Sequence, residues 1–244
     1  MHKIFSMNIA LIGYGKMGKI IEEIALQRGH TIVLKIDVDN QADFTKENVT
    51  KADVAIEFTG PHSAYENVKK VIAFGVPLVC GSTGWLEHLD EIKKSCTEKK
   101  GSFLYASNFS IGVNIFFEIN KRLAALMAPH SDYDVAITEI HHTQKKDAPS
   151  GTAITIAEGV LQNIHRKRNW VNHISENAGE LEIISERIDP APGTHVVRYS
   201  SAIDDIEISH KAHSRMGFAG GAVFAAEFIH DKKGIFSMKE VLGL

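Results

Sequence analysis

The sequence predicts an α/β protein: a Rossmann-like domain on a doubly wound parallel sheet, joined to an α+β substrate and oligomerisation domain with a mixed sheet. Two observations carry this prediction. Apolar runs alternate with amphipathic ones from residue 7 to residue 105, as in repeated βαβ units. After residue 110 the order changes to long helical patterns followed by several strand patterns. We therefore expect a dinucleotide-binding domain at 1–107 and 216–244, and a substrate-binding and oligomerisation domain at 108–215.

The first half reads as strands at 7–12, 31–36, 53–58, 77–80 and 102–105, with helices near 16–28, 63–74 and 86–100 between them. Strands that alternate with helices of this length form a parallel sheet with right-handed crossovers. The loops 58–61, 81–84 and 106–110 follow strand ends. We expect them to line one crevice, because ligands of open α/β sheets bind at the carboxyl ends of the strands.

The second half begins with a helix pattern at 113–127, a strand at 133–140 and a helix at 152–166. Strand patterns follow at 181–187, 195–200 and 205–210, which predicts a sheet rich in antiparallel pairs with helices packed on it. Residues 167–180 predict no element, and the chain from residue 216 to its end is expected to be helical.

Composition excludes several classes of protein. The 244 residues are 44% hydrophobic and 23% charged, with 27 basic and 30 acidic side chains and a formal charge of −3. The sequence has no block of like charge of the kind that binds nucleic acid. It also has no apolar run long enough to span a membrane. Cys80 and Cys96 are the two cysteines, too few for a disulfide framework. Together with an amino terminus that lacks a signal-peptide layout, this predicts a cytoplasmic protein.

A glycine motif, Gly13-x-Gly15-x-x-Gly18, follows the first strand and opens the first helix. In that setting the glycines allow a tight turn, close approach of a pyrophosphate and close packing of helix on strand. Asp37 ends the second strand, where a carboxylate can bind the adenine ribose hydroxyls. The acid favours NADH, while the nearby Lys16 and Lys35 leave NADPH open. The alternative is a glycine-rich turn that binds another nucleotide or none.

The stretch 139–153 concentrates polar side chains between a strand and a helix. Ser150 can cap that helix, and its terminus with Gly151 and Thr152 suits a carboxylate. Lys145 precedes it and can pair with an anion or donate a proton. His141 and His142 are neighbours at a strand end, so their side chains should point to opposite sides. A small anionic substrate is therefore expected here.

Two alternatives stay open at this point. A zinc ion held by His141, His142 and Asp147 is one, although neighbours on a strand do not converge easily on one metal, and we expect no metal site. The basic cluster 210–215 is either a solvated turn or a further anion contact.

Several motifs together resemble the bacterial dihydrodipicolinate reductase (4-hydroxy-tetrahydrodipicolinate reductase) family. The block His-His-x-x-Lys-x-Asp-Ala-Pro-Ser-Gly-Thr is the most specific of them, and the resemblance covers nearly the whole chain. The segments that carry it are 13–18, 58–61, 81–84, 108–114, 141–153, 193–195 and 209–215.

The resemblance implies roles position by position. Lys145 matches the proton donor, His141 an acid/base histidine and His142 a substrate-binding histidine. The substrate carboxylate would be held by Ser150, Gly151 and Thr152. Cofactor contacts are expected from two further groups: the glycine motif with Asp37, and two loops near the nicotinamide. These residues are Gly13, Tyr14, Gly15, Lys16, Met17, Gly18, Asp37, Gly81, Ser82, Thr83, Ser107, Asn108, Phe109 and Ser110. The family uses NADH or NADPH, acts on a small dicarboxylate and is usually a homotetramer.

The activity implied is NAD(P)H-dependent reduction of 4-hydroxy-tetrahydrodipicolinate on the diaminopimelate route to lysine, with Lys145 donating the proton. One rival is a catalytically silent nucleotide-binding protein of the same fold. Another is a Rossmann dehydrogenase that oxidises an amino acid or an aldehyde. An acyl-enzyme aldehyde dehydrogenase needs a nucleophilic cysteine, and neither Cys80 nor Cys96 has a suitable loop setting.

Overall fold

A computed structural model describes residues 6–244 of the chain. The protein divides into two compact units: the chain up to Ile111 with Arg215–Leu244, and Gly112–Ser214. We call them the first and second units. Among the described residues, no helix is both long and apolar enough to cross a membrane.

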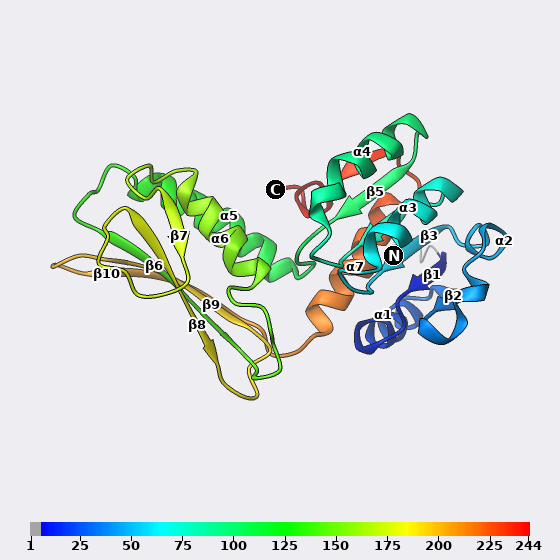
Figure 1. Ribbon diagram of the computed structural model, residues 1–244, viewed down its shortest axis with the longest axis horizontal. Coiled ribbons are helices and arrows are strands. Elements are labelled where there is room, and N and C mark those ends of the chain that lie inside the picture. Colours follow the sequence, from blue (N-terminus) through cyan, green and yellow to red (C-terminus); the bar gives the residue numbers. More distant parts are fainter. Residues whose placement is uncertain (1–5) are drawn as a thin grey trace. The chain divides into compact units, whose positions relative to one another are not determined.

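The first unit is a parallel sheet of six strands in the order β11-β5-β4-β3-β1-β2 (Figure 1). Strand order reverses at β1 and β3, which places the ligand-binding crevice at the carboxyl ends of these two strands. The elements of this unit in chain order are β1 Asn8–Ile12, α1 Lys16–Gln27, β2 Thr31–Ile36, η1 Val38–Asp43, α2 Lys46–Val49, β3 Val54–Glu57, α3 Ala64–Phe74, β4 Leu78–Cys80, η2 Leu86–His88, α4 Leu89–Glu98, β5 Ser102–Tyr105, α7 Met216–Ile229, β11 Gly234–Phe236 and α8 Met238–Leu242.

This sheet is covered on both faces, because its strands alternate buried residues between two cores. Ile9, Leu11 and Ile56 face a core shared with α1, α7 and α8. Ala10 and Ala55 face a second core, shared with α3 and α4. Strands buried on both faces are the near-continuous apolar runs by which the sequence predicted a doubly wound sheet, and that fold class is confirmed.

The carboxyl-terminal segment differs from the expected continuous helix. Residues 234–236 form β11, which pairs in parallel with β5 and extends the sheet by one edge strand. Its three residues are too few to show a strand period, so the pairing partner and not the local pattern decides its conformation. The helix expected at 86–100 is likewise split into η2 and α4.

The second unit contains a five-stranded mixed sheet in the order β10-β9-β6-β8-β7. Its pairs are half antiparallel, β10 with β9 and β9 with β6, and half parallel, β6 with β8 and β8 with β7. The predicted mixed sheet is therefore confirmed, with antiparallel pairs making up half of it and not most of it. Its elements are α5 Ile111–Met127, β6 Asp134–His141, α6 Gly151–Leu161, β7 Asn169–Val171, β8 Glu180–Arg187, β9 Thr194–Ser200 and β10 Asp205–Lys211.

Residues 162–168 leave the helical path that the sequence predicted to reach 166. Arg166 turns back and donates to the carbonyls of Ala128 at 3.0 Å and Tyr133 at 2.8 Å. These carbonyls lie just after α5 and just before β6. The change of direction also brings 169–171 alongside β8 as the short strand β7, where the sequence predicted no element.

Alternation along β6 sets up the site. Val135 and Ile137 point into the core with α5 and α6, and the next two inward positions are Glu139 and His141. Because strand side chains alternate strictly, the same face that is apolar at the start of β6 becomes polar at its end. Figure 1 shows α5 and α6 on one side of this sheet.

A pair of neighbouring glycines on α7 tests the packing of the first unit. A Cβ on Gly221 would lie 1.8 Å from the Phe109 carbonyl oxygen, whereas one on Gly220 would meet only Ile24 Cδ1 at 3.9 Å. We expect Gly221→Ala to destabilise the fold by about 1–3 kcal/mol through overpacking. The control Gly220→Ala should stabilise it by roughly 0.5–1 kcal/mol, as alanine generally does in a helix. Thermal melts by circular dichroism decide, and equal effects at both positions would contradict this packing.

Candidate active site

The glycine loop of the first unit has the geometry that a pyrophosphate needs. Gly13 adopts φ +100°, and a Cβ there would lie 2.2 Å from the Phe58 carbonyl oxygen. A Cβ on Gly18 would lie 2.3 Å from the Gly13 carbonyl oxygen, so both positions require glycine. By contrast, a Cβ on Gly15 meets nothing within 4 Å. Gly15 is also the N-cap of α1 and offers no side-chain cap, which leaves the helix terminus accessible to an anion.

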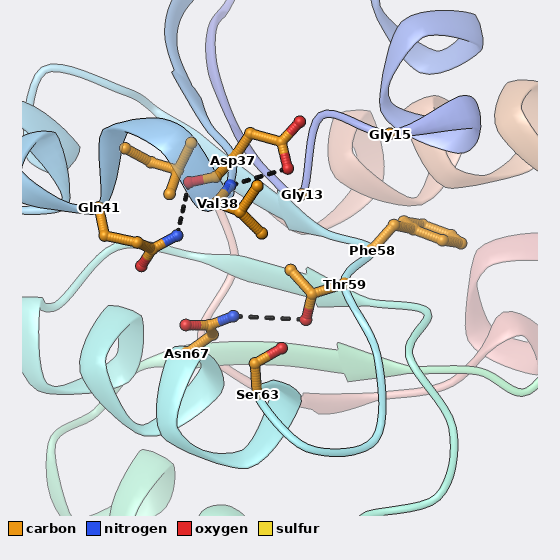
Figure 2. A pocket seen from close by; sticks show the side chains of 10 residues that line it. Gly13, Gly15, Asp37, Val38, Gln41, Phe58, Thr59, Ser63 and Asn67 are labelled. Carbon is orange, nitrogen blue, oxygen red and sulfur yellow. Dashed lines mark hydrogen bonds between the residues drawn. The ribbon is translucent and has the colours of Figure 1, made fainter.

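A pocket beside this loop extends to the end of β2 (Figure 2). Asp37 follows β2 there. Its carboxylate accepts from the Val38 amide at 2.9 Å, while Gln41 donates to the Asp37 carbonyl at 2.7 Å. This arrangement fixes Asp37 at the rim, where a carboxylate can receive ribose hydroxyls. The lining residues are Gly13, Gly15, Ile36, Asp37, Val38, Gln41, Phe58, Thr59, Ser63 and Asn67.

Lys35, which the sequence offered as a counter-charge for a 2′-phosphate, is already engaged. Its Nζ lies 2.6 Å from Glu22 Oε1 and 3.3 Å from the Tyr14 hydroxyl. Tyr14 in turn donates to Glu22, so its hydroxyl also belongs to this surface cluster. Lys16 lies elsewhere, in the lining of the adjacent pocket.

That adjacent pocket continues from the glycine loop to the ends of β3 and β4. Its lining combines the start of α1 with two loops: Gly15, Lys16, Met17, Phe58, Thr59, Gly60, Pro61, Gly81, Ser82 and Thr83. Two of the three loops expected to share a crevice therefore do so. Residues 107–110 are not among the lining of either pocket. Phe109 is 2% exposed, and its ring centroid lies 5.7 Å from that of Phe58.

In the second unit, strand register places a polar row across four strands. Glu139 of β6 lies opposite Ser185 of β8 and His195 of β9, and His195 lies opposite His210 of β10. Glu139 is 0% exposed, and His195 is also buried. Buried polar groups usually have hydrogen-bond partners, although in this row His195 Nδ1 and His210 Nδ1 have none among the described residues.

Glu139 is the acceptor at the centre of this row. Its Oε1 accepts from the Ser185 hydroxyl at 2.7 Å and from the Ser150 amide at 3.0 Å, and it lies 3.5 Å from Arg187 Nη2. Its Oε2 lies 3.3 Å from His141 Nε2 and 3.7 Å from His195 Nε2. Burial acts to raise the pKa of Glu139, but these hydrogen bonds outweigh it and hold that pKa well below its usual range.

His141 is held between this carboxylate and a glycine. Its Nε2 lies 3.4 Å from His195 Nε2, and a Cβ on Gly193 would approach His141 Cε1 to 3.0 Å. Gly193 thus makes room for the imidazole. Burial lowers the pKa of His195, although its hydrogen bond with Glu139 acts in the opposite direction. His142 is not a member of this cluster, in agreement with opposite directions for neighbouring side chains on a strand.

The start of α6 is organised by the same glutamate. Ser150 caps the helix, its hydroxyl accepting from the Ala153 amide at 3.1 Å, while its own amide donates to Glu139. The Ser150 amide thus ties the start of α6 to β6, and its hydroxyl, besides capping the helix, lies 3.4 Å from His195 Nε2. Gly151 is exposed, and a Cβ there would meet no atom within 4 Å, so the helix terminus is open to a ligand at this residue.

Lys145 is oriented by an ion pair and by its backbone. Its Nζ lies 2.8 Å from each carboxylate oxygen of Asp147. Arg187 donates to the carbonyls of Lys145 at 3.2 Å and Asp147 at 2.5 Å. Because Arg187 also approaches Glu139, one guanidinium links the loop that carries Lys145 to the buried row.

The side chains that could hold a zinc ion in the structure differ from the set that the sequence suggested. Among residues 6–244, the three side chains that converge are Glu139, His141 and His195, whereas Asp147 binds Lys145. Their contacts of 3.3–3.7 Å resemble the ligand separations around a tetrahedral ion. However, Arg187 already supplies a positive charge, and His195 Nδ1 has no partner, unlike the anchored histidines of zinc sites. The donor set suits a hydrogen-bonded cluster better than a cation.

The cluster at 210–215 also separates into parts. His210 ends β10 within the polar row, its ring 6.2 Å from that of Phe116, and burial lowers its pKa. Arg215 is the N-cap residue of α7. His210 is therefore part of the sheet and not of a solvated turn.

Comparison with known proteins agrees with these features. The family model for the N-terminus of dihydrodipicolinate reductase matches residues 7–109, and the model for its C-terminus matches residues 112–242. The chain belongs to the dihydrodipicolinate reductase family. It is an oxidoreductase of the NAD(P)H-dependent kind, and residues 7–109 match the family's N-terminal, NAD(P)-binding domain.

Relatives of this reductase span nearly its full length. The 4-hydroxy-tetrahydrodipicolinate reductase of Christiangramia forsetii is 48% identical over 237 residues, 97% of this chain and 98% of the relative. That of Methanosarcina barkeri is 40% identical over 213 residues, 85% and 79% of the two chains. A solved structure of dipicolinate-bound dihydrodipicolinate reductase from Paenisporosarcina sp. TG-14 shares the fold, with a TM-score of 0.73, 23% identity and coverage of 96% and 98%.

The site contains residues that sequence reasoning did not assign. In the reductase's second unit they are Glu139, Ser185 and Arg187, together with Gly193 and His195, whose segment the resemblance named without a role. In its first unit the residue is Gln41. The alternation along β6 would have placed Glu139 inward beside His141. Strand pairing, which brings Ser185 and His195 to it, has no local sequence signature.

Glutamine in place of Glu139 should weaken the fold in a pH-dependent way. The folded state depresses the pKa of this carboxyl from 4.5, so its stabilisation is present above that pH and is lost as the pH falls. At pH 7 we expect Glu139→Gln to cost about 3 kcal/mol, on the order of 5–10 °C in melting temperature. The difference in melting temperature should be constant from pH 7.5 to about pH 5 and should narrow from there to pH 3, because the folded-state pKa lies well below 4.5. Glu186→Gln, an exposed change on β8, is the control, and a gap independent of pH would refute this electrostatic account.

Proposed function

We propose that the protein catalyses the NAD(P)H-dependent reduction of 4-hydroxy-tetrahydrodipicolinate (dihydrodipicolinate) to tetrahydrodipicolinate, on the diaminopimelate route of lysine biosynthesis. The observation that carries this proposal is the loop 141–153, whose lysine, histidines and open helix terminus stand together in a chain matched over its length by such reductases.

Lys145 is the proposed proton donor. NAD(P)H, when bound, supplies a hydride to the conjugated ring of the substrate, and the electrons gained leave negative charge that one proton must balance. The Lys145 ammonium, oriented by Asp147 and by the Arg187 contact to its carbonyl, delivers that proton. His141 is the proposed acid/base partner, with Glu139 fixing its ring.

The substrate carboxylates are proposed to bind at the start of α6. Gly151 and Thr152 supply the helix terminus, where backbone dipoles favour an anion, and His142 supplies a second contact. Ser150 contributes indirectly, since its amide and hydroxyl shape the turn. The cofactor is proposed to lie along the glycine loop and Asp37, with its nicotinamide end toward residues 81–83 and 107–110.

NADH is the proposed preferred cofactor. Asp37 lies at the rim of the pocket that suits the adenine ribose, and neither Lys16 nor Lys35 lines that pocket. A 2′-phosphate there would face a carboxylate without a neighbouring cation, which is unfavourable.

The assembly is proposed to be a homotetramer formed through the second unit. On the face of its sheet opposite the α5–α6 core, Thr138, Ile184 and Val196 form one row of half-buried side chains. A partly apolar face of this kind supports contact with another copy. A cytoplasmic location is also proposed, and the two free buried cysteines support it.

The silent-binding rival predicts no turnover, and the Lys145 substitution separates it from the reductase. We expect Lys145→Ala to lower kcat by about 10²–10⁴-fold, the usual worth of a general acid. NADH affinity should change by less than about twofold, because the contacts of Lys145 lie within the second unit. The exposed neighbour Lys146 provides the matched control Lys146→Ala, which should keep wild-type rates. NADH oxidation with synthase-generated substrate is the assay, and unchanged turnover in Lys145→Ala rejects the assignment.

Cofactor preference tests the role of Asp37. Wild-type kcat/KM should favour NADH over NADPH by about tenfold or more, because like charges repel at the ribose. Asp37→Ser should reduce that ratio severalfold, whereas Asp39→Ser, an exposed acid on η1, should leave it unchanged. Equal ratios in wild type and Asp37→Ser would show that the carboxylate does not read the ribose.

Light scattering of the purified protein tests the tetramer. Wild type should have the mass of four chains, and Val196→Glu should lower it, because a charge in an apolar contact between copies costs more than the contact gains. A wild-type mass of one chain would exclude the assembly.

A further inference from the structure

The first unit holds a second buried glutamate to which the proposed reaction assigns no part. Glu57 ends β3, is 0% exposed, and lies opposite Cys80 at the end of β4. A buried carboxyl is costly unless it is well paired, and the other residues of β3 are apolar. Its retention at this position calls for a role beyond packing.

All the described donors to Glu57 come from the segment that follows β3 or from the end of β4 and its loop. Oε1 accepts from the Thr59 amide at 2.9 Å, from the Thr59 hydroxyl and from the Ser82 hydroxyl at 2.9 Å. Oε2 accepts from the Cys80 thiol at 2.9 Å. These donors are neutral, and burial raises the pKa of Glu57.

The same loops are also bound to each other around this carboxyl. The Thr59 amide donates to the Ser82 hydroxyl at 2.8 Å, and the indole of the buried Trp85 donates to the Ser82 carbonyl at 2.7 Å. Glu57 is thus the common acceptor beneath two loops that have no strand pairing of their own. A network with one shared acceptor sets the position of every member at once.

Those two loops form one wall of the pocket that continues from the glycine loop. Thr59 and Ser82 line it together with Lys16 and Thr83. The pocket beside Asp37 shares Thr59 but contains no residue of the 81–84 loop. Displacement of both loops would therefore alter the pocket that contains Lys16 and Thr83 more than the pocket beside Asp37.

We propose that Glu57 is a positioning residue for the pyrophosphate and nicotinamide half of the cofactor site. Its hydrogen bonds to Thr59 and Ser82 fix the positions of loops 58–61 and 81–84 relative to each other, and it does not itself touch the cofactor. This inference rests on the proposed function, because it takes the pocket for that of NAD(P)H. Glu57 as a packing residue alone is the competing account, and it predicts a change in stability without a change confined to one half of the cofactor.

Two substitutions separate these accounts. Glu57→Leu fills the volume with a side chain suited to a buried strand and removes every acceptor, and an apolar replacement of a buried polar group often preserves stability. Glu57→Gln retains a carbonyl oxygen for Thr59 and Ser82. Cys80→Ala, which removes only the thiol contact to Oε2, is the control.

Binding of NADH is measured by its fluorescence, and binding of AMP, which lacks the second phosphate, the second ribose and the nicotinamide, by calorimetry. We expect Glu57→Leu to weaken NADH by about tenfold or more, as for loss of a charge-assisted hydrogen-bond network. AMP should change by less than about threefold, since Asp37 and its pocket are retained. Glu57→Gln should restore NADH binding to within about threefold of wild type, and Cys80→Ala should match wild type.

The results that would contradict this inference differ from the result that would contradict the proposed function. Equal weakening of NADH and AMP in Glu57→Leu, or no weakening of either, overturns the inference, while wild-type NADH binding leaves the proposed function standing. Should Glu57→Leu fail to fold, Glu57→Gln decides, because wild-type melting with a tenfold loss of NADH binding also contradicts the assigned acceptor role. Failure of the wild-type protein to bind NADH contradicts the proposed function and this inference together.

Discussion

The second unit depends on one buried anion. Glu139 accepts from Ser185 and from the Ser150 amide, lies beside His141 and His195, and approaches Arg187. A carboxylate removed from water is tolerable only when its lone pairs are met in this way. Its presence therefore constrains three strands and the start of α6 together. The loop 142–149 has little regular structure of its own, so the positions of Lys145 and the helix terminus derive from this anchor and from Arg187.

A comparison of Glu57 with Glu139 shows how the same residue serves two purposes. Both lie at or near the end of a strand and both are fully buried. Glu57 has neutral donors, and burial raises its pKa, whereas the imidazoles around Glu139 help to depress its pKa. The difference follows from the ligands proposed for each site. Arg187 and Lys145 supply cationic donors for a dicarboxylate, and each also lies beside an acid, Glu139 or Asp147. Loops that surround a pyrophosphate need shape more than additional charge.

The extent to which sequence predicted this structure depends on how local each determinant is. The first sheet was predictable because its buried strands are continuous apolar runs and its glycine turn has fixed spacing. Strand β11 and strand β7 were missed because three residues carry no period, and pairing alone decides them. In the same way His141 and Lys145 stand in a recognisable block, but Glu139 acquires its partners from β8 and β9, which are distant in the chain. Register across strands is a tertiary property that local patterns do not encode.

The alternation of side chains along β6 explains why polar groups gather at the end of this strand. Along β6 the inward positions read Val135, Ile137, Glu139 and His141, so that one face contributes first to the core and then to the site. The apolar half holds α6 against the sheet through Ile156 and Val160, and the polar half receives the start of the same helix through Ser150. A helix whose body is packed in this way cannot move its first turn independently. The proposed carboxylate site is thus preorganised by the hydrophobic core, and loss of Glu139 should disturb the site and the stability of the unit together.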